Sequence, residues 1–227
     1  MEKNENNKLN NNQKSLRELV YTYFCEQMKT GNLSAGKFID QSAICKKLQI
    51  SRAPLRDAII QLETEGFVSI LPRRGVIINP MVLKDIADFY EILACLESEA
   101  VHSAYNKIKE YHLKKMESIN EKLYQALEEG KTEEYYKLNI EFHDIILDLT
   151  GNASFRNILS PIKQRLYDFP LKKYNIQWEK INLEEHARII ICLKNGNCEA
   201  AANIIKYEHW SFSQHEKYIK QFYKLSD

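Results

Sequence analysis

The spacing of apolar positions changes near residue 80, and this change predicts two structural regions. Before it, helical patterns lead into two short runs rich in β-branched residues, 67–71 and 76–78, which predict a β-hairpin. After it, apolar stripes at helical spacing continue with few breaks, because only three glycines and two prolines follow residue 80. The expected fold class is therefore mainly α, with an all-helical bundle as the C-terminal domain.

Residues 40–66 have the pattern of two short helices joined by a tight turn. Ala43, Ile44 and Leu48 are expected to share the buried face of the first helix. Ser51 offers an N-cap at which the second helix begins. The pair is typical of a helix-turn-helix motif.

The second helix of this pair carries exposed basic side chains. Its core stripe is Leu55, Ile59 and Leu62, which leaves Arg52 and Arg56 together on another face near the N-terminus. A recognition helix inserts that end into the DNA major groove. The alternative is that both arginines are ordinary solvated charges on the helix surface.

The hairpin that follows has a basic tip, Pro72-Arg73-Arg74-Gly75, and is typical of a wing. Its arginines can contact phosphates or the minor groove, and its glycine can adopt the positive φ of a tight tip. A purely structural β-ribbon is the alternative, but the order of helix, turn, basic helix and basic wing favours double-stranded DNA. The predicted DNA contacts are Ser42, Ser51, Arg52, Ala53, Arg56, Arg73, Arg74 and Gly75.

These motifs resemble the winged helix-turn-helix of the GntR family of bacterial transcription regulators. The residues that carry the resemblance are 31–36, Ser51 to Ala58, Leu62 to Val68 and Arg74-Gly75-Val76. Ala35 stands where the family usually has proline, and Ala53 where it often has threonine. The second difference removes a hydroxyl that could contact DNA, so operator preference is expected to differ.

Composition agrees with a cytoplasmic regulator of two domains. The 227 residues contain no apolar run long enough to span a membrane, and the five cysteines show no disulfide or zinc-finger spacing. The expected domains are a disordered tail at 1–13, rich in Asn and Lys, a DNA-binding domain at 14–80, and an effector-binding and dimerisation domain at 81–227. Residues 1–80 carry a formal charge of +4 and the remainder −3.

The candidate metal-binding residues of the helical half are mainly histidines. Its helices are predicted near 83–106, 109–129, 132–150, 153–172, 178–195 and 197–222, with Gly130, Gly151 and Gly196 at helix ends. Asn139 and His143 share one helix face, and His186 and His209 lie on two other helices. Three imidazoles and an amide oxygen can bind a divalent metal, although a helical His is more often a hydrogen-bonding or surface residue. The remaining histidines are expected to be surface or capping residues: His102, His112 and His215.

This half is similar to the ligand-binding FCD domain of the FadR subfamily, over roughly 83–220. The motifs are Leu96-Glu97, Asn139-x-x-Phe142-His143, Gly151-Asn152, Glu185-His186 and residues 201–209. The resemblance implies a metal such as Zn or Ni held by Asn139, His143, His186 and His209. Asn139 replaces the usual Asp, so affinity should be lower and the site more positive by one unit. Leu93 stands at a position of the first helix where relatives commonly have an arginine near the ligand, so the effector contacts are expected to differ from those usual in the family.

The resulting hypothesis is a ligand-responsive repressor that binds a palindromic operator as a homodimer and senses a small organic acid. Arg165 and Arg188 are candidate second anchors for the effector carboxylate, with surface ion pairs as the alternative. A non-sensing DNA-binding protein is a competing hypothesis. An enzyme is not expected: a metal-dependent hydrolase would need Glu141 or Glu185 as general base, and Glu141 should point away from the ligand face.

Overall fold

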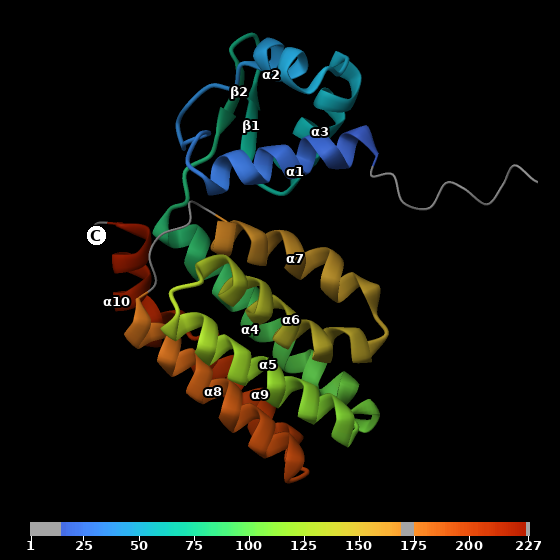
Figure 1. Cartoon of the computed structure of the whole chain (residues 1–227), viewed down its shortest axis with the longest axis vertical. Coiled ribbons are helices and arrows are strands. Elements are labelled where there is room, and N and C mark those ends of the chain that lie inside the picture. Colours follow the sequence, from blue (N-terminus) through green and yellow to red (C-terminus); the bar gives the residue numbers. More distant parts are fainter. Residues whose placement is uncertain (1–14, 169–174, 226–227) are drawn as a thin grey trace, which may run out of the picture. The chain divides into compact units, whose positions relative to one another are not determined.

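The computed structural model describes residues 15–168 and 175–225, and the chain divides into two compact units, Met1–Pro80 and Met81–Asp227. The tail predicted for 1–13 and the end of the helix predicted for 153–172 lie outside the described residues. The mainly α fold class is confirmed, because helices form most of both units and the strands described form one hairpin (Figure 1).

The first unit consists of three helices and the hairpin. They are α1 (Leu16–Lys29), α2 (Gln41–Leu48), α3 (Arg52–Thr64), β1 (Val68–Leu71) and β2 (Gly75–Ile78). Helix α1, for which the sequence pattern gave no explicit prediction, begins with a capping box between Ser15 and Glu18. It packs against α3, and apolar side chains from both helices and from the hairpin form the core of this unit.

The turn between α2 and α3 holds the recognition-helix candidate against this core. Gln49 closes α2 in the left-handed region, with φ of 53°. Ser51 occupies the predicted N-cap of α3, although its hydroxyl makes no capping hydrogen bond. The expected buried face of α2 was partly wrong: Ile44 is buried, whereas Ala43 is exposed. Ala43 faces solvent because the core lies under Ile44, and adjacent helical residues point about 100° apart.

The hairpin is antiparallel and short. Val68 pairs with Ile78 and Leu71 with Gly75, so buried Val68, Val76 and Ile78 share its inner face. An isolated bridge between Phe38 and Ile77 adds a third segment to its edge.

The second unit is a bundle built around α4. Its elements are α4 (Leu83–Ala104), a 3₁₀ turn (Tyr105–Lys107), α5 (Glu110–Glu128), α6 (Thr132–Thr150), α7 (Ala153–Asp168), α8 (Ile176–Lys194), α9 (Cys198–Ile204), a π-helical turn (Ile205–His209) and α10 (Phe212–Tyr223). Helix α4 contacts α6, α7, α9, the π turn and α10. Gly130, Gly151 and Gly196 have positive φ at helix ends, as predicted.

The prediction of one helix over 197–222 was wrong. The Trp210 amide donates to the Ile205 carbonyl in a π-type hydrogen bond, and α10 then starts afresh. Two side chains stabilise this break, because Gln214 Nε2 donates to the Tyr207 carbonyl and His215 Nε2 to the Glu208 carbonyl. These carbonyls would otherwise accept from the next turn of a continuous helix.

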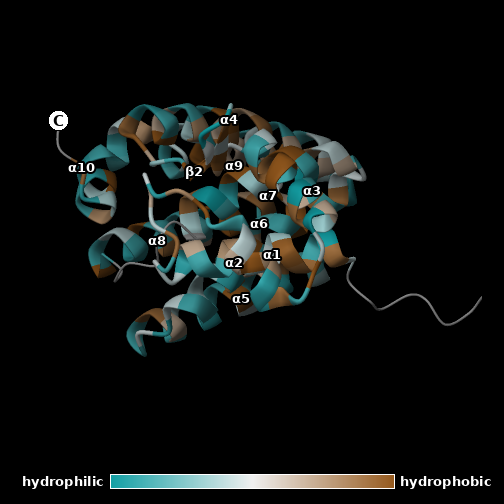
Figure 2. Ribbon diagram, turned by 90° about the horizontal axis from the view of Figure 1, so that it is seen from above, coloured by the Kyte–Doolittle hydropathy of each residue, from teal (hydrophilic) through white to brown (hydrophobic). Residues whose placement is uncertain are grey.

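The helices are amphipathic and carry both hydrophobic and hydrophilic residues (Figure 2). Within the described residues, none combines the length and the apolar character needed to cross a membrane. Burial of their apolar faces produces the interior in which the histidines meet.

Candidate functional site

The side chains of His143, His186 and His209 meet in the interior of the second unit. They come from α6, α8 and the π turn, and each is at most 5% exposed. His143 Nε2 lies 3.3 Å from His186 Nε2 and 3.2 Å from His209 Nε2. Nitrogens that share one tetrahedral zinc ion at about 2.0–2.1 Å lie about 3.3 Å apart. The spacing of these nitrogens is therefore that of a metal-binding set.

The other ring nitrogen of each imidazole has its own hydrogen-bond acceptor. His143 Nδ1 donates to Glu97 Oε2 over 2.9 Å, and His209 Nδ1 donates to Glu185 Oε2 over 2.8 Å. His186 Nδ1 lies 3.2 Å from Asn120 Oδ1. Such partners fix the tautomer with the proton on Nδ1 and leave the Nε2 lone pair for a metal.

The orientation of the Asn120 amide is fixed independently of the histidine. Its Nδ2 donates to the backbone carbonyl of Leu183 over 3.2 Å, so Oδ1 is the atom that faces His186. With all three protons on Nδ1, three Nε2 lone pairs point at one another, which is unfavourable without a cation between them. The donor set therefore fits a divalent metal.

Burial keeps two of these imidazoles neutral. It lowers the pKa of His143 to about 4, although contact with Glu97 opposes the shift. It also lowers the pKa of His186 well below its ordinary value, and the neighbouring imidazoles add to the effect. A neutral imidazole is the form that binds metal.

A buried ion pair supports His143 from behind. Glu97 Oε1 lies 2.6 Å from Lys163 Nζ, and Trp210 Nε1 donates to Glu97 Oε2 over 2.8 Å. Burial opposes ionisation of Glu97, but His143 and Lys163 outweigh it and hold the pKa of this carboxyl well below its usual range. The carboxylate therefore stays charged and positions the ring.

Asn139 lies on the same face of α6 as His143 and is buried. Its Nδ2 donates to the Tyr167 hydroxyl over 2.9 Å. Its Oδ1 has no hydrogen-bond partner among the described residues, and a buried carbonyl oxygen in this state is unfavourable. A metal ligand role would satisfy it.

A small cavity adjoins the histidines and is lined by polar and aromatic side chains. Its free volume is about 30 Å³, room for about two water molecules. Its lining includes Asn139 and His209 as well as Glu179 and Asn182. The cavity therefore connects the histidine cluster with a second group of buried polar atoms.

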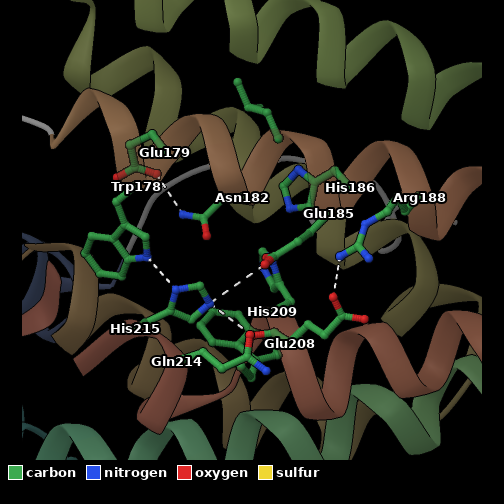
Figure 3. A network of polar contacts seen from close by, with 12 residues as sticks. Trp178, Glu179, Asn182, Glu185, His186, Arg188, Glu208, His209, Gln214 and His215 are labelled. Carbon is green, nitrogen blue, oxygen red and sulfur yellow. Dashed lines mark hydrogen bonds and ion pairs between the residues drawn. The ribbon is translucent and has the colours of Figure 1, made fainter. Parts of the chain in front are cut away.

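The two arginines expected to hold an effector do not line this cavity. Arg165 is buried, with its guanidinium 5.0 Å from the centre of the Phe89 ring. Arg188 is about half exposed and forms an ion pair with Glu208, visible in Figure 3. The geometry of Arg188 matches the surface ion pair that was the alternative, and effector contact by either arginine stays a prediction.

His215 corrects the expectation of a surface or capping residue. It is 2% exposed, accepts from Trp178 Nε1 at Nδ1 over 3.1 Å, and donates from Nε2 to the Glu208 carbonyl over 2.9 Å (Figure 3). His112 does cap, since its Nδ1 accepts from the Lys109 amide over 3.0 Å, and His102 is exposed. His215 thus stabilises the π turn that carries His209.

The residues suggested as a hydrolytic base lie away from the histidine lone pairs. Glu141 is ion-paired with Lys115 and 44% exposed. Glu185 binds Nδ1 of His209, on the opposite side of the ring from the cluster. Neither carboxylate is placed to activate a water at the cluster.

The predicted DNA contacts form part of the surface of the first unit. Ser42 is exposed in the first turn of α2, and Ser51, Arg52, Ala53 and Arg56 are exposed along the start of α3. Arg73 and Arg74 are exposed at the wing tip, before half-buried Gly75 with φ of 108°. Arg73 itself has φ of 61°, a conformation unusual for a residue with a Cβ.

Sequence reasoning missed the roles of the supporting residues Glu97, Asn120, Lys163 and Trp210. A signal existed for three of them, since each polar residue occupies a position of an apolar helical stripe. Glu97 falls between Leu93 and Val101, Lys163 between Leu159 and Leu166, and Asn120 between Met116 and Leu123. A charged or amide side chain on an apolar face indicates a buried polar partner.

Comparison with known proteins gives two family matches. Residues 16–78 match the model of bacterial regulatory proteins of the gntR family, and residues 88–209, more than half of the chain, match the FCD domain. The chain is 28% identical over 206 residues to the uncharacterized HTH-type transcriptional regulator YdhC of Bacillus subtilis, covering 88% of this chain and 92% of that protein.

Two further proteins are similar over most of their length. The HTH-type transcriptional repressor RspR of Escherichia coli is 21% identical over 190 residues, which cover 83% of each chain. The solved structure of E. coli McbR/YncC has a TM-score of 0.75 at 20% identity and covers 93% of this chain and 100% of that one. The structural likeness shows a shared fold.

Proposed function

The chain belongs to the GntR family of bacterial transcription regulators and carries an FCD domain, and from this premise we propose a metal-dependent effector sensor of the FadR subfamily. In this proposal a homodimer binds a palindromic operator and represses transcription until a small carboxylate metabolite binds. The assignment as a repressor draws on the relative RspR, which is a transcriptional repressor.

The convergence of three Nε2 atoms is the single observation that carries the sensor proposal. The residues proposed to hold the metal are His143, His186 and His209, with Asn139 Oδ1 as a fourth ligand. When bound, a divalent metal supplies a Lewis-acidic anchor for a carboxylate. A small cavity lined by Asn139 and His209 adjoins these ligands and is the proposed position of the effector.

DNA binding is proposed for the exposed basic surface of the first unit. The N-terminal end of α3, with Arg52 and Arg56, would enter the major groove, and Arg73 and Arg74 would contact the backbone beside it. A dimer places two such helices on the half-sites of a palindrome. Effector binding changes operator affinity by favouring one arrangement of the two DNA-binding units.

The DNA-binding part can be tested with a duplex selected from a random library and fluorescence anisotropy at one salt concentration. Arg56→Ala should weaken binding by about 1–3 kcal/mol. Arg17→Ala, which removes the same charge from exposed α1, is the matched control and should change affinity less. Equal affinities of the Arg56→Ala variant and the unmodified protein would remove α3 from the interface.

The sensor can be tested by elemental analysis of the purified protein. His143→Ala combined with His186→Ala should abolish metal retention, because it leaves one imidazole at the cluster. His102→Ala removes an exposed imidazole and should leave the metal content unchanged. Full retention in the double variant would show that the metal binds elsewhere.

A further inference from the structure

The cavity that adjoins the histidine cluster has one carboxylate in its wall. Glu179, on α8, lines the cavity and is only 4% exposed. Its Oε2 accepts from the Tyr135 hydroxyl over 2.8 Å and from Asn182 Nδ2 over 3.0 Å. Figure 3 shows Glu179 and Asn182 together on α8, on the same helix as His186. The described residues that line the cavity include no lysine or arginine.

The cavity is therefore lined both by two candidate metal ligands, Asn139 and His209, and by the buried carboxylate of Glu179. On the metal side the ligands are three imidazoles and a carboxamide, all neutral, so the charge of a bound divalent ion is not offset by its own ligands. The Glu179 carboxylate already accepts two hydrogen bonds, and a positive charge nearby would stabilise its ionised form further. Burial raises the pKa of Glu179 above its ordinary value, and a cation beside it would favour the ionised form.

We propose that the effector is a small amino acid, bound with its carboxylate toward the histidine cluster and its ammonium group toward Glu179. This assignment rests on the proposed metal-dependent sensor and narrows its ligand from organic acids in general to zwitterions. A second carboxylate in the ligand would face Glu179 and be repelled, because the described residues of the cavity wall include no lysine or arginine to compensate its charge. The free volume of about 30 Å³ holds only about two water molecules, so binding of a small amino acid requires the side chains that line the cavity to move apart.

The experiment is calorimetric titration of the full chain loaded with Zn²⁺, with probes of nearly equal size: L-alanine, β-alanine, L-lactate, propanoate and malonate. One of the two amino acids should bind roughly tenfold or more tightly than propanoate, the gain of one charge-assisted hydrogen bond. Malonate should bind most weakly. This ranking in the unmodified protein tests the proposal without any variant.

Glu179→Gln supplies the second test, because it keeps the shape of the side chain and an acceptor for Tyr135. The variant should lose roughly tenfold of its affinity for the preferred amino acid, while propanoate affinity stays the same and malonate affinity rises. Glu184→Gln removes an exposed carboxylate from the same helix and should leave all five affinities unchanged. Zinc content, measured in parallel, reports whether each variant retains the folded cluster.

The outcomes separate this inference from the function on which it rests. The proposal of a zwitterionic effector would be refuted if the amino acids bind no better than propanoate. It would also be refuted if L-lactate binds as tightly as L-alanine and β-alanine. An unchanged ranking in Glu179→Gln would overturn the role of this residue. Binding of the amino acid to chelator-treated protein with unchanged affinity would instead refute the metal-dependent sensor.

Discussion

The two units place their candidate functional residues in opposite environments. In the first unit Arg52, Arg56, Arg73 and Arg74 are exposed on a small apolar core, and the described contacts leave their charges facing solvent. In the second unit the three clustered histidines are almost fully buried, and each depends on a partner from a different helix. A surface that binds DNA can be changed without disturbing the fold, whereas a buried polar network couples binding to stability.

The largest effect expected from this coupling is that of Glu97→Ala. The substitution leaves Lys163, at 2% exposure, without its ion-pair partner and removes the acceptor for His143 and Trp210. Breaking a buried ion pair from one side costs about 3–5 kcal/mol. Urea denaturation followed by tryptophan fluorescence measures this loss in the second unit, because both tryptophans, Trp178 and Trp210, belong to it.

The double variant Glu97→Leu with Lys163→Met is the matched control. It removes both charges and replaces them with apolar side chains, so it should be more stable than Glu97→Ala. A loss of no more than about 0.5 kcal/mol in Glu97→Ala, the size expected at an exposed position, would show that this buried network contributes little to stability.

The second effect is a loss of stability in acid when metal is absent. His143, with a pKa of about 4, and His186, with a pKa well below its ordinary value, stay neutral in the folded unit. In the unfolded chain they take up protons below about pH 6.5, so stability falls as pH drops from there toward the folded values. For His143 the loss at pH 5 is about 2 kcal/mol.

Urea midpoints in chelator at pH 7, 6 and 5, followed by tryptophan fluorescence, test this direction. The raised pKa of Glu179 acts in the opposite sense, which makes the combined slope shallower than the histidines alone would give. In His186→Gln the acid-induced loss should be smaller, because one titrating imidazole is gone. Midpoints independent of pH over this interval would contradict burial of neutral imidazoles.

The contrast between the units also explains what the sequence could predict. Helix boundaries, the hairpin and its tip follow from local patterns, and these local elements matched the structure closely. The break in the helix at Ile205–His209 was not predicted, because no glycine or proline marks it. The side chains of Gln214 and His215 stabilise it instead, and their contacts depend on the tertiary arrangement.

The histidine cluster shows the same limit at the level of the site. Spacing placed Asn139 and His143 on one face of α6, but it could not show that Asn120 on α5 orients His186 or that Lys163 on α7 pairs with Glu97. Those contacts join residues at least 66 positions apart in sequence. Periodicity describes one helix at a time, so pairings between helices lie beyond it.

The third prediction tests one such pairing without breaking an ion pair. Asn120→Leu removes the acceptor for His186 Nδ1, and loss of such a partner typically lowers metal affinity by about 10–100-fold. Competition with a chelating dye measures the affinity. Asn120→Asp keeps an acceptor and should retain most of the metal affinity. Asn203→Leu, which changes an exposed asparagine elsewhere, is the control. Equal affinities for Asn120→Leu and Asn203→Leu would show that His186 needs no partner.

The smallest predicted effect asks whether an exposed residue of the first unit influences stability. Arg73 follows Pro72 at the wing tip with φ of 61°, and the Arg74 amide donates to the Leu71 carbonyl over 3.0 Å. A left-handed residue with a Cβ costs about 1–2 kcal/mol, and glycine avoids it. Arg73→Gly should therefore stabilise the hairpin slightly, by about 0.5–1 kcal/mol after the added chain entropy.

Arg74→Gly is the matched variant, because it removes the same charge at a position without positive φ. Both variants should lower the salt dependence of DNA binding by about one counterion. Only Arg73→Gly should slow hydrogen exchange of the β2 amides, Gly75–Ile78, in the full chain. If the two variants exchange alike, backbone strain at the tip is negligible, and the first unit carries its charges at no structural cost. If they differ as expected, Arg73 is an exposed residue that affects both DNA binding and stability. Its side chain would affect DNA binding, and its backbone conformation would affect stability.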